Sequence, residues 1–358
     1  MQVTAETSNR IKNLGLFCSL LVVVIHVWRA PISNPIGWAI TDLIQPGVTG
    51  MAVPFFFAVS GYFLAGHIGV SGWYVGEWKK RVLSLLIPMF AWNLTWMVGR
   101  LVVAVCSDGV LSPSEMWLED VTCHGAYPRP LLFNITGGWL SAIGLNPFAF
   151  PAMIQFWYLR ALFLLVVLSP LLLRLATNCG LVMVLAVYGS LCPFVVGEYS
   201  DLDVFLRSTI SLEGVFYFTV GMYLRQHPVK LNKWKAVSII IMAIITVVAG
   251  SWCRCHGLLI AGNWLRWVSL PFVLISFWIL TPTVCLPSWL TSCAFPIYLA
   301  HILVIRSIDA VSLPLDGLGP VASWGLKICI AVLISIGFSV IFRRLFPKVS
   351  RFYLGGRC

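Results

Sequence analysis

Long apolar runs recur along most of the chain and limit what it can fold into. Helices that cross the roughly 30 Å hydrocarbon core of a bilayer need about 20 residues. Inside that core the backbone must satisfy its own hydrogen bonds, so each run is expected to be an α-helix. We therefore predict an all-α, polytopic membrane helix bundle of about ten transmembrane helices. The runs cover approximately residues 13–29, 48–66, 83–105, 155–174, 180–197, 208–224, 235–252, 263–282, 290–307 and 321–344.

The composition excludes a soluble globular enzyme. Hydrophobic residues make up 59% of the chain and charged residues only 10%, with a mean hydropathy of +0.91. Soluble domains have about 25% charged residues. No polar stretch reaches the roughly 50 residues of the smallest domains. We expect residues 1–358 to form a single integral-membrane domain whose function resides inside the bundle.

The distribution of Lys and Arg predicts the orientation. Ten spans place both termini on one side, and the segments on that side carry fifteen of the 24 basic residues. The opposite segments carry six: Arg29, Arg129, Arg207, Arg254, Arg266 and Arg306. They also hold most of the acidic residues, Asp42 among them. Because cytoplasmic loops are rich in Lys and Arg, we expect both termini to be cytoplasmic. The net charge of +11 then reflects orientation, and we expect no nucleic-acid partner.

One long connection, at about residues 106–154, is unusually aromatic. It contains Trp117, Trp139, Phe148 and Phe150. Aromatic rings settle at headgroup depth, so we expect this segment to form an outer interfacial loop. A lid over an outer cavity and a packing loop both remain open for it.

Six ionisable residues remain inside the apolar runs, and in the predicted topology all six fall in the outer half of the membrane. A charged, unpaired side chain at a helix centre costs roughly 2.5–3.5 kcal/mol. The shared depth predicts a polar cavity that opens outward. The six residues are His26, Arg100, Arg160, Glu213, His301 and Lys327.

Each of these residues also has a structural interpretation. Arg100 and Lys327 can extend their long stems to the outer headgroups. Arg160 can pair with Glu213 as a structural ion pair instead of binding a ligand. His301 can be a satisfied core histidine. His26 has the stronger functional case, because an imidazole exchanges protons near neutral pH.

Two basic clusters precede apolar runs on the predicted cytoplasmic side. Such clusters bind anionic lipid headgroups, and they can equally hold the phosphates of a cytosolic cofactor. The first cluster is Lys79, Lys80 and Arg81, and the second is Lys230, Lys233 and Lys235.

The familiar short catalytic motifs are absent. The sequence contains no GxxxxGK[ST], GxGxxG, GxSxG or HExxH. Cys253, Cys255 and His256 lie together, but their spacing is not that of a usual zinc site, so we expect no metal. The eleven cysteines are scattered and predict no disulfide framework.

Five segments, in order, resemble the membrane acyltransferase 3 family, whose members O-acetylate cell-surface glycans. The resemblance is to the stand-alone integral-membrane type. The segments are residues 11–26, which end in VVVIH; 53–64, VPFFFAVSGYFL; 80–88, which begin with KR and end in LIP; 156–170, which begin with FWYL and end in LSP; and 295–301, FPIYLAH.

The resemblance implies an O-acyltransferase of the cell (inner) membrane. It implies that His26 is the catalytic base, and Arg160 is our candidate for steadying the oxyanion or the acceptor. The donor would be acetyl-CoA or another cytosolic acyl-CoA, held near Lys79, Lys80 and Arg81. The acceptor would be an extracytoplasmic glycan or lipid-linked sugar. We expect five residues to bind substrate: Trp157, Tyr158, Glu213, Tyr298 and His301.

One position departs from the family pattern. The family usually has an arginine eleven residues before the histidine, and that position here is Gly15. Arg10 and Lys12 lie sixteen and fourteen residues from His26, at least roughly 20 Å along a helix. Either another cation replaces the arginine or the activity is altered.

Two other functions remain open at this point. A transporter or flippase of an anionic or sugar-bearing lipid would use the polar cavity as one face of its pathway, although few polar groups lie in the inner half. A sensor descended from the enzyme would fit the altered position at Gly15. Ser60 can be read as an acyl carrier, but a Ser before Gly is more often a helix-packing residue.

Overall fold

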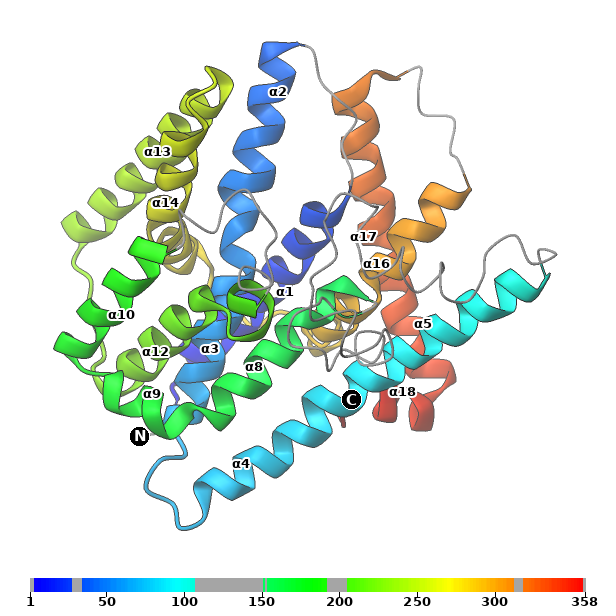
Figure 1. The fold of residues 1–358 in the computed structure, drawn as a ribbon, viewed down its shortest axis with the longest axis horizontal. Helices are drawn as coiled ribbons and strands as arrows, with labels where there is room; N and C mark the ends of the chain where they lie inside the picture. The colour runs from blue at the N-terminus through cyan, green and yellow to red at the C-terminus, as the bar shows by residue number, and fades with distance from the viewer. Residues whose placement is uncertain are drawn as a thin grey trace. The chain divides into compact units, whose positions relative to one another are not determined.

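The computed structural model describes residues 3–27, 34–106, 151, 153–191, 205–311 and 318–356. Within these ranges all regular secondary structure is helical, with no strand (Figure 1). The predicted all-α class is therefore confirmed. Most of the predicted outer loop at 106–154 lies outside the described residues.

Six helical segments of the described chain are long and apolar enough to cross a membrane. A bent helix pair over residues 154–175 raises the number to seven if it counts as one span. Each of the ten apolar runs coincides with at least one helix, while ten crossings and cytoplasmic termini remain predictions. The six segments are Ala5–His26, Ile36–Ala65, Trp73–Gly99, Lys233–Cys255, Leu259–Leu280 and Pro320–Leu345.

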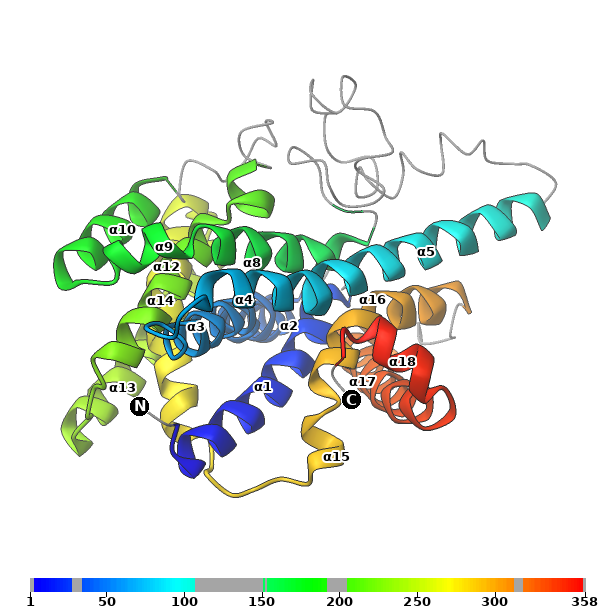
Figure 2. The same ribbon diagram turned by 90° about the horizontal axis from the view of Figure 1, so that it is seen from below.

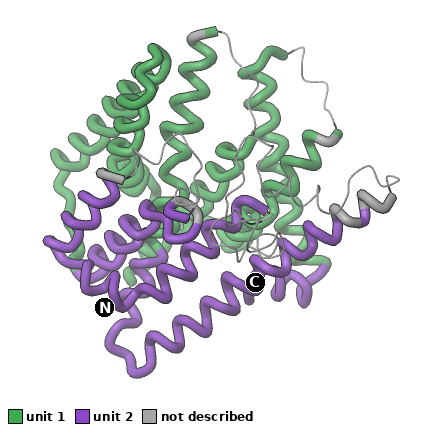
Figure 3. The backbone as a smooth tube through the Cα atoms, in the orientation of Figure 1, with its two compact units in different colours: residues 1–59, 227–345 green, residues 60–226, 346–358 purple. Residues whose placement is uncertain are grey.

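The chain divides into two compact units, coloured separately in Figure 3. Unit 1 combines Met1–Val59 with His227–Leu345, and unit 2 combines Ser60–Gln226 with Phe346–Cys358. Helix α3 (Ala52–Ala65) begins in unit 1 and ends in unit 2. Each unit thus combines segments that are distant in the sequence.

Unit 1 is organised around the first helix, α1 (Ala5–His26), which packs against α16 (Ala294–Ala310) and α17 (Pro320–Leu345). Its core includes Leu16, Val23, Val24, Ile297, Ile305 and Trp324. The hairpin of α13 (Lys233–Cys255) and α14 (Leu259–Leu280) lies side by side in both views (Figures 1 and 2). The short α15 (Ser288–Thr291) precedes α16.

The second span of unit 1 changes helix type at a proline. Helix α2 (Pro35–Asp42) continues through the π-helix η1 (Leu43–Val48) and the 3₁₀ turn η2 (Thr49–Met51) into α3. Pro46 lies inside η1. Because proline lacks an N–H and its ring crowds the carbonyl four residues earlier, an α-helix cannot pass through it undisturbed. Gly47 lets α13 approach this break, since a Cβ there would lie 2.9 Å from Val247 Cγ1.

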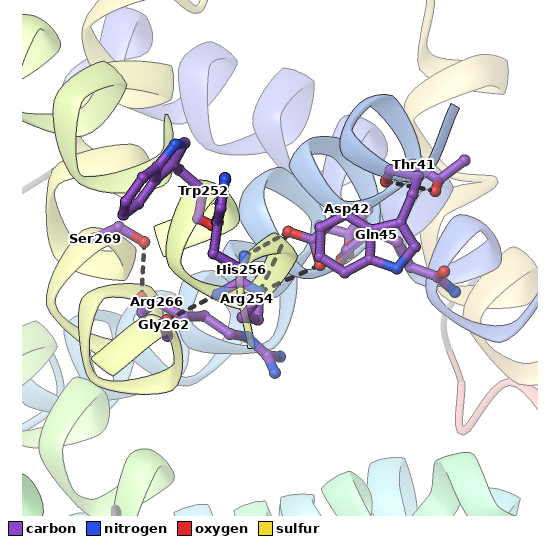
Figure 4. A network of polar contacts seen from close by, with 11 residues as sticks. Thr41, Asp42, Gln45, Trp252, Arg254, His256, Gly262, Arg266 and Ser269 are labelled. Carbon is purple, nitrogen blue, oxygen red and sulfur yellow. Dashed lines mark hydrogen bonds and ion pairs between the residues drawn. The ribbon is translucent and has the colours of Figure 1, made fainter. Parts of the chain in front are cut away.

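A buried ion pair joins this span to the α13–α14 hairpin (Figure 4). Arg254 Nη2 lies 2.7 Å from Asp42 Oδ2, and Arg254 Nε lies 3.2 Å from both carboxylate oxygens. Arg254 Nη1 also donates to the Gly262 carbonyl at 2.7 Å. The charge count assigns Asp42 and Arg254 to connecting segments, but the structure places both in helices, with 3% and 9% of their side chains exposed.

Unit 2 begins with a long helical stretch that runs through a π-helical break. It comprises α4 (Trp73–Arg81), η3 (Val82–Leu86) and α5 (Ile87–Cys106), with Pro88 just beyond the break. Further along, α8 (Trp157–Val167) and α9 (Ser169–Leu175) meet at a 74° bend, where Pro170 opens the second helix. The remaining elements are η4 (Ile154–Phe156), α10 (Asn178–Leu191), η5 (Phe205–Thr209), α12 (Leu212–Gln226) and α18 (Pro347–Tyr353).

The Asp42–Arg254 pair should be the most sensitive ion pair of unit 1. Removing one partner of a buried pair leaves an uncompensated charge, so Arg254→Met should lower the free energy of unfolding by about 3–5 kcal/mol. Lys327→Met is the matched control, because the Lys327–Asp309 pair is 31% and 45% exposed and such pairs contribute at most about 1 kcal/mol. Thermal unfolding in detergent measures both. Equal losses in the two variants would contradict the prediction.

Candidate active site

His26 is the last residue of α1 and follows the apolar sequence LVVVI. Thr4 caps the start of the helix by accepting from the Thr7 N–H at 3.2 Å, and Val27 is extended at its end. The imidazole folds back along the helix, with Nδ1 2.9 Å from the Val22 carbonyl oxygen. The side chain is half-buried.

The structure brings His26 together with the second predicted histidine, His301, which lies 275 residues later. His301 Nε2 is 3.2 Å from His26 Nδ1, and the ring centroids are 4.9 Å apart. His301 belongs to α16 and is fully buried. Because α1 and α16 both lie in unit 1, this contact is internal to one compact unit.

The partners of the two rings determine a consistent tautomer for each. His301 Nδ1 lies 2.7 Å from the Tyr298 carbonyl oxygen, which can only accept, so a neutral His301 carries its proton on Nδ1. Its Nε2 is then an acceptor toward His26. His26 Nδ1 faces this acceptor and the Val22 carbonyl, so it carries the proton of a neutral His26. The Nε2 atom of His26 retains its lone pair and can act as a base.

Tyr298, a predicted substrate-binding residue, lies beside the histidines. It is buried, its ring is 6.1 Å from that of His301 and it stacks on Phe295. Its backbone carbonyl has a defined role, since it orients His301. His26, Tyr298 and His301 therefore form one group in unit 1.

The other predicted site residues lie in unit 2. Arg160 and Tyr158 are buried in the first turns of α8, and Trp157 begins that helix, half-buried, with its ring perpendicular to that of Tyr158. Glu213 lies half-buried in the first turn of α12, which packs against α8. Arg160 and Glu213 thus occupy neighbouring helices of the same unit.

The basic cluster of Lys79, Lys80 and Arg81 forms the last turn of α4. Lys80 and Arg81 of this cluster, together with His67 at 3.3 Å, lie beside a carboxylate that was not among the predicted site residues. Glu77 is 6% exposed and lies 3.6 Å from Lys80 Nζ and 3.5 Å from Arg81 Nη2. Glu77 precedes Lys80 and Arg81 by three and four residues, and this helical spacing could have predicted the ion pairs. Lys79 is exposed to the surroundings.

Of the remaining ionisable residues, Lys327 pairs with Asp309 at 3.0 Å in a partly exposed position. The side chain of Arg100 lies outside the described residues. Three of the six ionisable residues behind the predicted cavity lie in the described part of unit 1. His26 contacts His301 there, and Lys327 forms this ion pair with Asp309.

Comparison with known families gives a match over most of the chain. The family model for the acyltransferase domain of the acyltransferase 3 family matches residues 11–344. The chain belongs to the acyltransferase 3 family. No curated protein and no solved structure matches it.

Family membership confirms the resemblance of the sequence. The structure also explains the glycine in one of the resembling segments by helix packing. Gly61 of the VPFFFAVSGYFL segment faces α12, and a Cβ there would overlap the carbonyl group of Phe218. Only glycine permits this approach of two helix backbones. At Gly15 the situation differs, since a Cβ would make ordinary contact with Phe55 Cε1 at 3.7 Å.

Gly61→Ala should therefore destabilise this acyltransferase. Overpacking of a closely packed contact costs about 1–3 kcal/mol, because the two helices must separate. Gly325→Ala in α17 is the matched control, since its Cβ would meet nothing within 4 Å and alanine favours a helix by about 0.5–1 kcal/mol. Unfolding temperature in detergent should fall for the first variant and stay or rise for the second. A tolerated Gly61→Ala would refute the packing role.

Proposed function

We propose that this acyltransferase transfers an acyl group, acetyl in the simplest case, from cytosolic acyl-CoA to a hydroxyl group of an extracytoplasmic glycan or lipid-linked sugar. The observation that carries the proposal is the His26–His301 contact, which assigns the proton of a neutral His26 to Nδ1 and the lone pair to Nε2, at the end of a candidate membrane helix. Family membership supports the acyl-transfer chemistry. The proposed location is the cell inner membrane.

The reaction requires one proton acceptor. His26 Nε2 removes the proton of the acceptor hydroxyl while its oxygen attacks the thioester carbonyl carbon. The bond between that carbon and sulfur breaks, and the departing CoA thiolate receives the proton from His26. The products are the ester and CoA with a free thiol. The Nδ1–H of His26 keeps two acceptors throughout, so the ring does not have to turn when it becomes charged.

Charge also develops on the thioester oxygen. Donors that face this oxygen only in the transition state lower the barrier, and a guanidinium is a strong donor. We assign this role to Arg160, with steadying of the acceptor as its alternative task. Trp157 and Tyr158 of the same helix, and Glu213 of the neighbouring α12, are the proposed sugar-binding groups.

The proposed site for the CoA phosphates is the end of α4. Lys79 and Lys80 are exposed cations that can meet a phosphate, whereas Arg81 is mostly buried against Glu77. We therefore assign phosphate binding to Lys79 and Lys80, and assign Arg81 to holding the end of α4 in place through Glu77.

Loss of the base should abolish transfer. His26→Ala should lower the transfer of radiolabelled acetyl-CoA to envelope glycan by about 10²–10⁴-fold, the usual contribution of a general base. His301→Ala should reduce it less, because His26 Nδ1 keeps the Val22 carbonyl. His256→Ala is the control, an exposed histidine of unit 1 bonded to its own helix. Unchanged transfer in His26→Ala membranes with normal protein levels would overturn the assignment.

The donor site makes a separate prediction. Changing Lys79 and Lys80 together to Gln should raise the KM for acetyl-CoA several-fold with little change in kcat, because the lost contacts bind the donor equally before and during reaction. The matched control changes Lys230 and Lys233, exposed lysines of the other basic cluster, to Gln. A raised KM in the control alone would place the donor at that second cluster instead.

A further inference from the structure

Two side chains from other helices bind backbone carbonyl groups at the end of α1. A helix leaves its last carbonyl groups without intrahelical partners. In an apolar environment no water replaces those partners, and each unsatisfied group costs several kcal/mol. His26 lies in this last turn, so whatever satisfies these carbonyls also fixes the backbone that carries the imidazole.

The carbonyl that precedes His26 is bound by Gln45. Its Nε2 donates to the Ile25 oxygen at 2.9 Å and lies 3.5 Å from the Val24 oxygen. Gln45 is half-buried in the π-helix η1, directly before Pro46. One amide thus serves two of the last carbonyls of α1.

The carbonyl that follows His26 is bound by Trp324. Its indole Nε1 donates to the Val27 oxygen at 3.2 Å. Trp324 is 4% exposed and packs in the same core as Val27. The residue before His26 and the residue after it are therefore each held by a side chain from a different helix, while His301 contacts the ring.

The segment that presents Gln45 is itself fixed. Three residues before it, Asp42 is bound to Arg254 of α13, and Figure 4 shows Gln45 close to this pair. On the other side of Pro46, Gly47 packs on Val247 of the same helix. The π-helical turn is thus held against α13 at two points, and Gln45 extends from it to α1.

We infer that Gln45 and Trp324 are positioning residues that hold His26 in its reactive orientation through its two flanking carbonyls. The inference rests on the proposed function, because the base they serve is His26. It assigns catalytic importance to two residues that touch no reacting atom. A misplacement of about 1 Å in a catalytic group can lower the rate about 10²-fold.

The test compares Gln45→Met and Trp324→Phe with Asn13→Leu. Asn13 is a matched control because its amide also donates to two backbone carbonyls, those of Pro282 and Val284, at 2.9 and 2.8 Å. It lies on the same helix, thirteen residues and about 20 Å from His26. All three variants lose similar bonds, so a purely structural role predicts the same behaviour for all.

We expect Gln45→Met and Trp324→Phe to lower kcat by about 10- to 100-fold, with the KM for acetyl-CoA changed less than about twofold. Asn13→Leu should lower the unfolding temperature by a comparable amount but keep kcat within about twofold. The assay uses radiolabelled acetyl-CoA and a fixed amount of envelope glycan. Trp324→Phe tests the inference alone if Gln45→Met fails to accumulate in membranes.

A second comparison separates this inference from the proposed function. If Gln45 acts through His26, adding Gln45→Met to His26→Ala should cause no further loss of the residual rate. Multiplicative losses, or a kcat unchanged in both positioning variants, would overturn the inference and leave the proposed function intact. A His26→Ala variant with full activity, or a wild-type protein without acetyl transfer, would overturn both.

Discussion

Polar groups that lie in an apolar surrounding must find their hydrogen-bond partners within the protein. A helix that ends between apolar segments exposes carbonyl groups, and hydrocarbon provides no donors for them. The end of α1 meets this demand with Val27, Gln45 and Trp324, and the same demand makes His301 turn its Nδ1–H toward Tyr298. Side chains of η1 and α17 therefore hold the backbone on both sides of the candidate base.

Three irregular stretches of the helical backbone contain a proline or lie beside one. Pro46 lies within the π-helix that presents Gln45, Pro88 follows the π-helix after the basic cluster, and Pro170 opens the helix beyond the 74° bend after Arg160. In each case proline removes a backbone donor and disturbs an otherwise continuous span. Gln45 and the basic cluster at the end of α4 thus lie next to helix breaks.

The sequence predicted the regular part of the fold well, because hydropathy depends on local composition. Each of the ten apolar runs coincides with a helix in its described part, and the family resemblance pointed to His26 and His301, which the structure brings into contact. The Asp42–Arg254 pair had no signal in the sequence, because its members are 212 residues apart and individually resemble loop charges. Gln45 had none either, since an amide beside a proline has no sequence pattern that distinguishes a positioning role from a turn. Glu77 could have been found from its helical spacing to Lys80 and Arg81.

The glycine at position 15 fits the proposed chemistry once distances along α1 are considered. Eleven residues separate Gly15 from His26, which is about 16 Å along a helix. A side chain at position 15 would thus begin far from the His26 imidazole and face Phe55. Arg10, which lies over the Trp278 ring at 5.3 Å, is engaged elsewhere. Gly15 therefore lies apart from the hydrogen bonds that hold the His26 ring and its two flanking carbonyl groups.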